Sequence, residues 1–154
     1  MYGIEYIRDL VRWSRKTVLE SNPELLLKGR INIREGDGWL GDEQHQYFAA
    51  IHVGAAASEI PSGLVSQLDY GGRLVVPVAD QKDKPNKGQS LWVVDRDFLT
   101  GEITKTKHIP VRFVPLVKAS SLQSLQVLSV LPDGHSSRSS VSSVTSAVES
   151  PESL

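Results

Sequence analysis

The sequence predicts an α/β protein built on a parallel, doubly wound sheet. Short apolar runs that fit strands alternate with segments whose apolar residues recur at helical spacing. The continuous apolar run at residues 47–53 has the pattern of a strand buried on both faces, as parallel strands usually are. A chain of 154 residues with 40% hydrophobic residues is also long enough to form one domain with a core.

The first half of the chain contains a strand, a helix and a second strand. Residues 2–7 form the first strand, and the helix that follows has one apolar face (Ile7, Leu10, Val11 and Val18). Asn22-Pro23 ends this helix, because a residue that precedes proline avoids the α conformation. A short helical turn through 23–26 closes at Gly29. Residues 30–35 alternate as a strand and end in a Gly-Asp-Gly turn at 36–38.

The second half continues this alternation and then changes character. A polar loop at 42–46 precedes the 47–53 run, and 60–68 form a short helix with Pro61 in its first turn. Another buried strand covers 73–78. Residues 90–97 and 109–116 form a later strand pair, joined by a polar connection at 97–107, which we expect to add an antiparallel edge.

The last part of the chain differs in composition from the rest. We assign 1–118 to the ordered domain, 119–131 to a short helix, and 132–154 to a Ser-rich tail. We expect the tail to be disordered, because it has too little apolar surface to offset the entropy lost on ordering. It is either an inert tail, which we favour, or a phosphorylation substrate.

Composition excludes several classes of function. With 17 Lys and Arg against 18 Asp and Glu, no excess of positive charge is available for nucleic acid or an anionic membrane surface. The chain has no Cys, and its four His show no metal-ligand spacing, so we expect no metal site. We expect a cytoplasmic monomer.

Two acidic residues follow strands that the topology places next to each other. Glu5 ends the first strand, with Tyr6 beside it, and Asp37 with Gly38 follows the second. Ligands of open parallel sheets lie beyond the carboxyl ends of the strands. One carboxylate there can accept hydrogen bonds from ribose hydroxyls and the other from an adenine amino group. A solvated turn carboxylate is the plain alternative for each acid taken singly.

The order of several segments carries a resemblance to a known family. YGIEYI, then GDGWLG, then IHVGAAA, then a Pro-led helix and GGRLVVPV closely resemble the protein-L-isoaspartate O-methyltransferases over about residues 2–117. The resemblance implies a Rossmann-like methyltransferase fold that uses S-adenosyl-L-methionine. It implies methyl transfer to the carboxyl group of L-isoaspartyl or D-aspartyl residues in damaged proteins, which are the expected partners. Their methyl esters collapse to succinimides and reopen partly as normal aspartate.

The resemblance also gives roles to individual residues. Glu5 takes the ribose-binding position, and the cofactor-binding set is Glu5, Tyr6, Asp37 and Gly38, the last two on the adenine side. The segment His52, Val53, Gly54 and Ala55 matches the family's HVGA sequence near the methyl-transfer cleft. In-line transfer from a sulfonium to a carboxylate needs positioning and desolvation more than a general base. The resemblance places the family's active-site hydroxyl residue in a region that this sequence lacks, so we assign no catalytic residue within it.

The sequence departs from the family pattern at its beginning. No G-x-G-x-G occurs, so the loop that cradles the methionine part of the cofactor is lacking, as is the region with the active-site hydroxyl residue. The sequence begins where the second strand of the family sheet is expected, so the first, central strand is lacking. Three interpretations follow: a partial and inactive methyltransferase sequence, which we favour; a short, non-catalytic relative acting as an interaction protein; or another nucleotide-binding α/β protein. The genomic DNA directly upstream would separate the first two.

Overall fold

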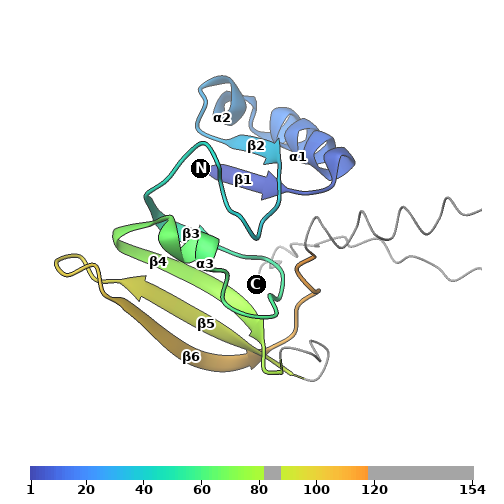
Figure 1. The fold of residues 1–154 in the computed structure, drawn as a ribbon. Coiled ribbons are helices and arrows are strands. Elements are labelled where there is room, and N and C mark those ends of the chain that lie inside the picture. The colour runs from blue at the N-terminus through green and yellow to red at the C-terminus, as the bar shows by residue number, and fades with distance from the viewer. Residues whose placement is uncertain (82–87, 118–154) are drawn as a thin grey trace, which may run out of the picture.

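The computed structural model describes residues 1–81 and 88–117, which form two separate sheets (Figure 1). The first sheet pairs β1 (Tyr2–Glu5) with β2 (Asn32–Glu35). The second has the order β3-β4-β5-β6, from β3 (Phe48–His52), β4 (Leu68–Ala79), β5 (Gln89–Arg96) and β6 (Ile103–Val111). The predictions for 119–131 and 132–154 lie outside the described residues.

The first sheet is parallel and carries two helices. β1 and β2 align in register from the Tyr2–Asn32 pair to the Glu5–Glu35 pair. The chain between them forms α1 (Arg8–Ser21) and α2 (Pro23–Leu27), which meet at Asn22, as the Asn-Pro pair predicted. Within α1 only Val11 is fully buried, because a two-stranded sheet offers little surface to cover. Arg15 on α1 also donates a 2.7 Å hydrogen bond to the carbonyl of Ile33 in β2.

The second sheet combines a parallel pair with an antiparallel edge. β3 and β4 are parallel, whereas β5 and β6 each run antiparallel to the preceding strand. The predicted antiparallel edge is therefore confirmed. α3 (Ser62–Ser66) begins directly after Pro61 and connects β3 to β4. Parallel neighbours need such a crossover, because a tight turn can join only antiparallel strands.

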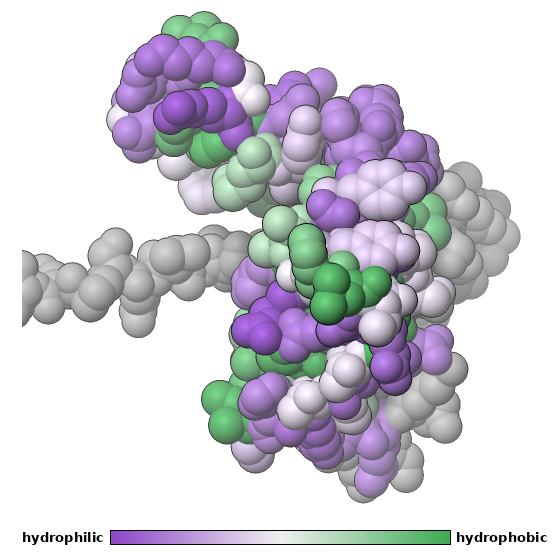
Figure 2. Space-filling view, turned by 90° about the vertical axis from the view of Figure 1, so that its left-hand side faces the viewer, coloured by the Kyte–Doolittle hydropathy of each residue, from purple (hydrophilic) through white to green (hydrophobic). Residues whose placement is uncertain are grey.

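The hydrophobic core belongs to the second sheet. β4 supplies its centre, with Leu68, Leu74 and Val76 each at 0% exposure, and Val94 of β5 is equally buried. Leu64 of α3 joins the same cluster. The face of the molecule in Figure 2 is a mixture of hydrophilic surface and separate hydrophobic groups.

Three sequence predictions need correction. Strand β3 is not buried on both faces: Ala49, Ala50 and His52 are exposed, because β4 is its sole strand partner and its other edge is unpaired within the described residues. A single sheet is also wrong for these residues, since β1 and β3 do not pair. The predicted 97–107 connection is too long and the predicted strand at 109–116 is misplaced, because β6 spans Ile103–Val111.

Candidate functional site

The two predicted cofactor carboxylates lie at the same edge of the first sheet. Glu5 ends β1, and its carbonyl accepts a 3.0 Å hydrogen bond from the amide of Gly36, which directly precedes Asp37. Because both strands end here, the two acids share one strand-end edge. Glu5 and Tyr6 are half-buried. The Glu5 carboxylate accepts a 2.8 Å hydrogen bond from the amide of Ile7, which leaves further lone pairs for a ligand.

The turn after β2 holds its own shape through Asp37. The Asp37 carboxylate accepts a 2.9 Å hydrogen bond from the Trp39 amide. The backbone carbonyl of Asp37 accepts a 3.0 Å hydrogen bond from the Leu40 amide. This is the local bonding by which aspartate stabilises turns. Gly38 packs on Leu116: a Cβ built at this glycine would stand 3.6 Å from the Leu116 side chain, an ordinary contact. Asp37 and Gly38 are half-buried.

Residues 52–55 lie in the other sheet, at the carboxyl end of β3. Val53 is buried, and its amide donates a 3.0 Å hydrogen bond to the Val75 carbonyl in β4. His52 and Gly54 are exposed, and Ala55 is half-buried. Gly54 has open space around it, since a Cβ there would meet no atom within 4 Å. Val53 therefore fixes the segment to the sheet, while His52 and Gly54 are accessible to solvent at this strand end.

The two groups of predicted residues are connected through Leu116. The Trp39 indole donates a 3.3 Å hydrogen bond to the Leu116 carbonyl, next to the Gly38 contact. The Leu116 amide in turn donates a 2.8 Å hydrogen bond to the carbonyl of Ala56, which directly follows Ala55. The strand-end turn of the first sheet is thus attached to the strand end of the second.

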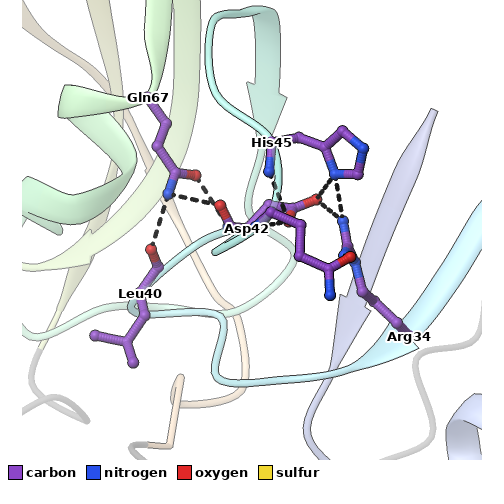
Figure 3. Close-up of polar contacts among 6 residues, drawn as sticks. Arg34, Leu40, Asp42, His45 and Gln67 are labelled. Atoms are coloured by element: carbon purple, nitrogen blue, oxygen red, sulfur yellow. Dashed lines mark hydrogen bonds and ion pairs between the residues drawn. The ribbon is translucent and has the colours of Figure 1, made fainter.

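Sequence reasoning missed a polar cluster beside this site, which Figure 3 shows in close-up. Asp42 was expected in a polar loop, yet it is only 4% exposed. Its carboxylate pairs with Arg34, and the side chain of Gln67 binds the same loop from the other side. The available signal was that an aspartate side chain often accepts the amides two and three residues further on, here Gln44 and His45.

The charge state of Asp42 follows from these contacts. Burial opposes its ionisation, but the Gln44 amide, the Arg34 charge and the His45 amide outweigh burial and hold the pKa of the Asp42 carboxyl below its ordinary value. A buried carboxylate that is paired and hydrogen-bonded in this way stays ionised.

The arrangement fits one end of a nucleoside cofactor better than the other. Carboxylates at Glu5 and Asp37 supply the acceptors that ribose hydroxyls and an amino group need, and Gly38 allows close approach of a ring. Residues 1–81 and 88–117 contain no G-x-G-x-G loop, and Arg8, near this edge, is paired with Glu35 at 2.8 Å. The chemistry of this edge is therefore that of hydrogen-bond acceptors for hydroxyl and amino donors.

A hollow elsewhere in the described structure lies apart from the predicted residues. One hollow of about 450 Å³ lies at the opposite end of the second sheet, between α3 and the β5–β6 hairpin, and contains none of the predicted residues. The described residues include no group of three or more His, Asp or Glu side chains arranged to hold a metal. None of the helices described is long and apolar enough to cross a membrane.

Comparisons with known proteins agree on one family. The family model for protein-L-isoaspartate (D-aspartate) O-methyltransferase (PCMT) matches residues 1–121. Protein-L-isoaspartate O-methyltransferase 1 of Arabidopsis thaliana is 42% identical over 115 residues, covering 74% of this chain and 47% of the relative. The enzyme of Triticum aestivum is 39% identical over 120 residues, covering 77% and 49%. This chain spans about half the length of the curated relatives that it matches.

Solved structures give the same result. A protein-L-isoaspartate O-methyltransferase from Plasmodium falciparum, crystallised in complex with S-adenosyl-L-homocysteine, superposes with a TM-score of 0.65 at 32% identity. The match covers 76% of this chain and 52% of that one. A second protein-L-isoaspartate O-methyltransferase structure, at 22% identity and a TM-score of 0.59, supports the fold alone. Members of this family are S-adenosylmethionine-dependent enzymes. This chain belongs to the protein-L-isoaspartate (D-aspartate) O-methyltransferase family.

Proposed function

We propose that this chain is the part of an isoaspartyl-repair methyltransferase that binds the adenosine end of S-adenosylmethionine. The observation that carries the proposal is the shared edge of Glu5 and Asp37, joined by the Gly36–Glu5 hydrogen bond of 3.0 Å. The Glu5 carboxylate would accept hydrogen bonds from the ribose hydroxyls, with Tyr6 beside the ribose. Asp37 and Gly38 would contact the adenine. The S-adenosyl-L-homocysteine bound by the Plasmodium relative supports this choice of cofactor.

The acceptor would be the abnormal carboxyl group of an L-isoaspartyl or D-aspartyl residue in a damaged protein. That carboxylate is ionised at neutral pH and is itself the nucleophile, while the bound cofactor supplies an activated methyl group. The residues around the transfer would then act by positioning and by excluding water. His52 to Ala55 are the proposed cleft residues, because they lie at the neighbouring strand end and connect through Leu116 to the Gly38 turn.

We further propose that the Rossmann-like sheet of this chain lacks its central strand and glycine-rich loop. Among the described residues β1 and β3 each have one unpaired edge, which supports this, because one parallel strand between them would join the two sheets into a continuous order. The exposure of Ala49 and Ala50 in β3 supports it as well, since an inner parallel strand is normally covered. The 154-residue chain is then expected not to transfer methyl groups to an isoaspartyl peptide, and measurable turnover would contradict this.

Calorimetry with S-adenosyl-L-homocysteine tests the adenosine assignment. Asp37→Ala removes the proposed adenine contact and is expected to weaken binding about tenfold, as the loss of one charge-assisted hydrogen bond would. Asp9→Ala is the matched control, because Asp9 is a helix-surface carboxylate whose side chain is 87% exposed. Equal affinities of the wild type and the Asp37 variant would refute the assignment.

A further inference from the structure

The connection between β2 and β3 is closed at its base by a charged pair. Arg34 lies on β2, and eight positions later Asp42 accepts a hydrogen bond from its guanidinium. The Asp42 side chain is 3% exposed and that of Arg34 is 18% exposed, so water screens this pair little. The pair encloses residues 35–41, which include Asp37 and Gly38. A segment whose ends are tied has fewer conformations than an open one of equal length.

Both oxygens of Asp42 are used (Figure 3). One accepts the Gln44 amide at 2.9 Å and the His45 amide at 3.2 Å. The other faces Arg34 and lies 3.2 Å from the His45 ring nitrogen Nδ1. The first oxygen thus shapes the segment after the loop, whereas the second ties the loop to β2.

Gln67, the residue that caps α3 directly before β4, holds the same loop. Its amide nitrogen donates to the carbonyls of Leu40 at 3.2 Å and Asp42 at 3.1 Å, and its oxygen accepts the Asp42 amide at 2.9 Å. The loop is therefore fixed on one side by Arg34 of β2 and on the other by Gln67 at the end of α3. The Asp37–Gly38 turn belongs to this loop, and its Gly38 also packs on Leu116.

We propose that Asp42 is a positioning residue that holds the Asp37–Gly38 turn in its binding conformation through the pair with Arg34. The proposal rests on the proposed function, because the turn matters to catalysis only if it receives the cofactor. Asp42 itself lies in the return segment of the loop and need not touch the ligand.

Amide hydrogen exchange of the whole chain tests this without requiring a ligand. Asp42→Asn keeps an acceptor for the Gln44 and His45 amides but removes the charge that holds Arg34, whereas Asp42→Ala removes both. In both variants we expect the Trp39 and Leu40 amides to exchange about tenfold faster than in the wild type. Gln44 and His45 should be fast only in the Ala variant. The matched control is Asp95→Asn, which breaks an exposed ion pair with Arg73 in the second sheet and should leave residues 36–45 unchanged.

Two results would overturn the proposal. One is unchanged exchange of Trp39 and Leu40 in the Asn variant, which would restrict Asp42 to its own turn. The other is equal acceleration throughout β4 and β5, which would make the effect a general loss of stability. Titration of the same variants with S-adenosyl-L-homocysteine separates the two claims. Failure of the wild type to bind counts against the proposed function, while the exchange pattern still decides the role of Asp42.

Discussion

Replacing Gly41 with Ala tests how strongly Gln67 holds the loop. Both the backbone conformation at this position and the lack of space for a Cβ favour glycine. Its φ of +76° is in the left-handed region, and a Cβ there would overlap the Gln67 side-chain oxygen and stand 3.0 Å from the Leu64 side chain. The backbone term costs about 1–2 kcal/mol for a residue with a side chain. Displacing Gln67 would also lose its three hydrogen bonds to the loop, at about 1 kcal/mol each. Together the terms predict a loss of about 4–5 kcal/mol in the free energy of unfolding.

Gly29→Ala is the matched control for the backbone term. Gly29 has a φ of +65°, and a Cβ there would meet nothing within 4 Å, so this variant should lose only about 1–2 kcal/mol. Urea unfolding of both variants gives the difference. In a Gln67→Ala background the Gln67 clash is absent and only the 3.0 Å contact with the Leu64 side chain remains, so Gly41→Ala should cost less than in the wild type and approach the cost of the control. Equal losses for the two glycine variants in the wild-type background would refute the reasoning that Gln67 clamps this loop.

Two further predictions concern the core and the pH dependence of stability. Leu74→Ala removes a side chain with 0% exposure from the centre of β4 and should lower the free energy of unfolding by about 2–5 kcal/mol in urea, whereas a loss under 1 kcal/mol would mean that the core collapses around the gap. The pKa of Asp42 is lowered in the folded state, and so are those of Asp80, bonded to Lys107 and Ser90, and Asp97, bonded to the Thr100 and Leu99 amides. Their stabilisation is complete above the ordinary aspartate pKa of 3.8 and is lost as the pH falls through the lowered values. The urea concentration at the midpoint of unfolding should therefore decrease as the pH is lowered below about 4. A midpoint concentration that stays constant over this range would contradict the assigned ion pairs and hydrogen bonds.

The sequence predicted the elements well where a local pattern determines them. The Asn22-Pro23 boundary between α1 and α2 and the start of α3 after Pro61 agree with the structure. The start of β6 was missed because Thr104, Lys105 and Thr106 are all exposed, so the edge strand shows no apolar alternation. An apolar alternation arises only where one face of a strand is buried, and little of this edge strand is buried.

The environment of β3 could not be read from its own residues. Its apolar pattern suits a strand with neighbours on both edges, but the described structure supplies one, so Ala49 and Ala50 remain exposed. The polar cluster was missed for a related reason. Arg34, Asp42 and Gln67 are separated by 8 and 25 positions along the chain, and only the fold brings them together.

We propose that this chain holds the adenosine end of the cofactor and lacks the loop that would hold the methionine end. The most direct test compares its affinity for adenosine with its affinity for S-adenosyl-L-homocysteine by calorimetry under the same conditions. We expect both to bind with dissociation constants that agree within about threefold, because the described residues include no glycine-rich loop to hold the amino-acid tail. Binding of S-adenosyl-L-homocysteine more than about a hundredfold tighter than adenosine, or no binding of either, would contradict it.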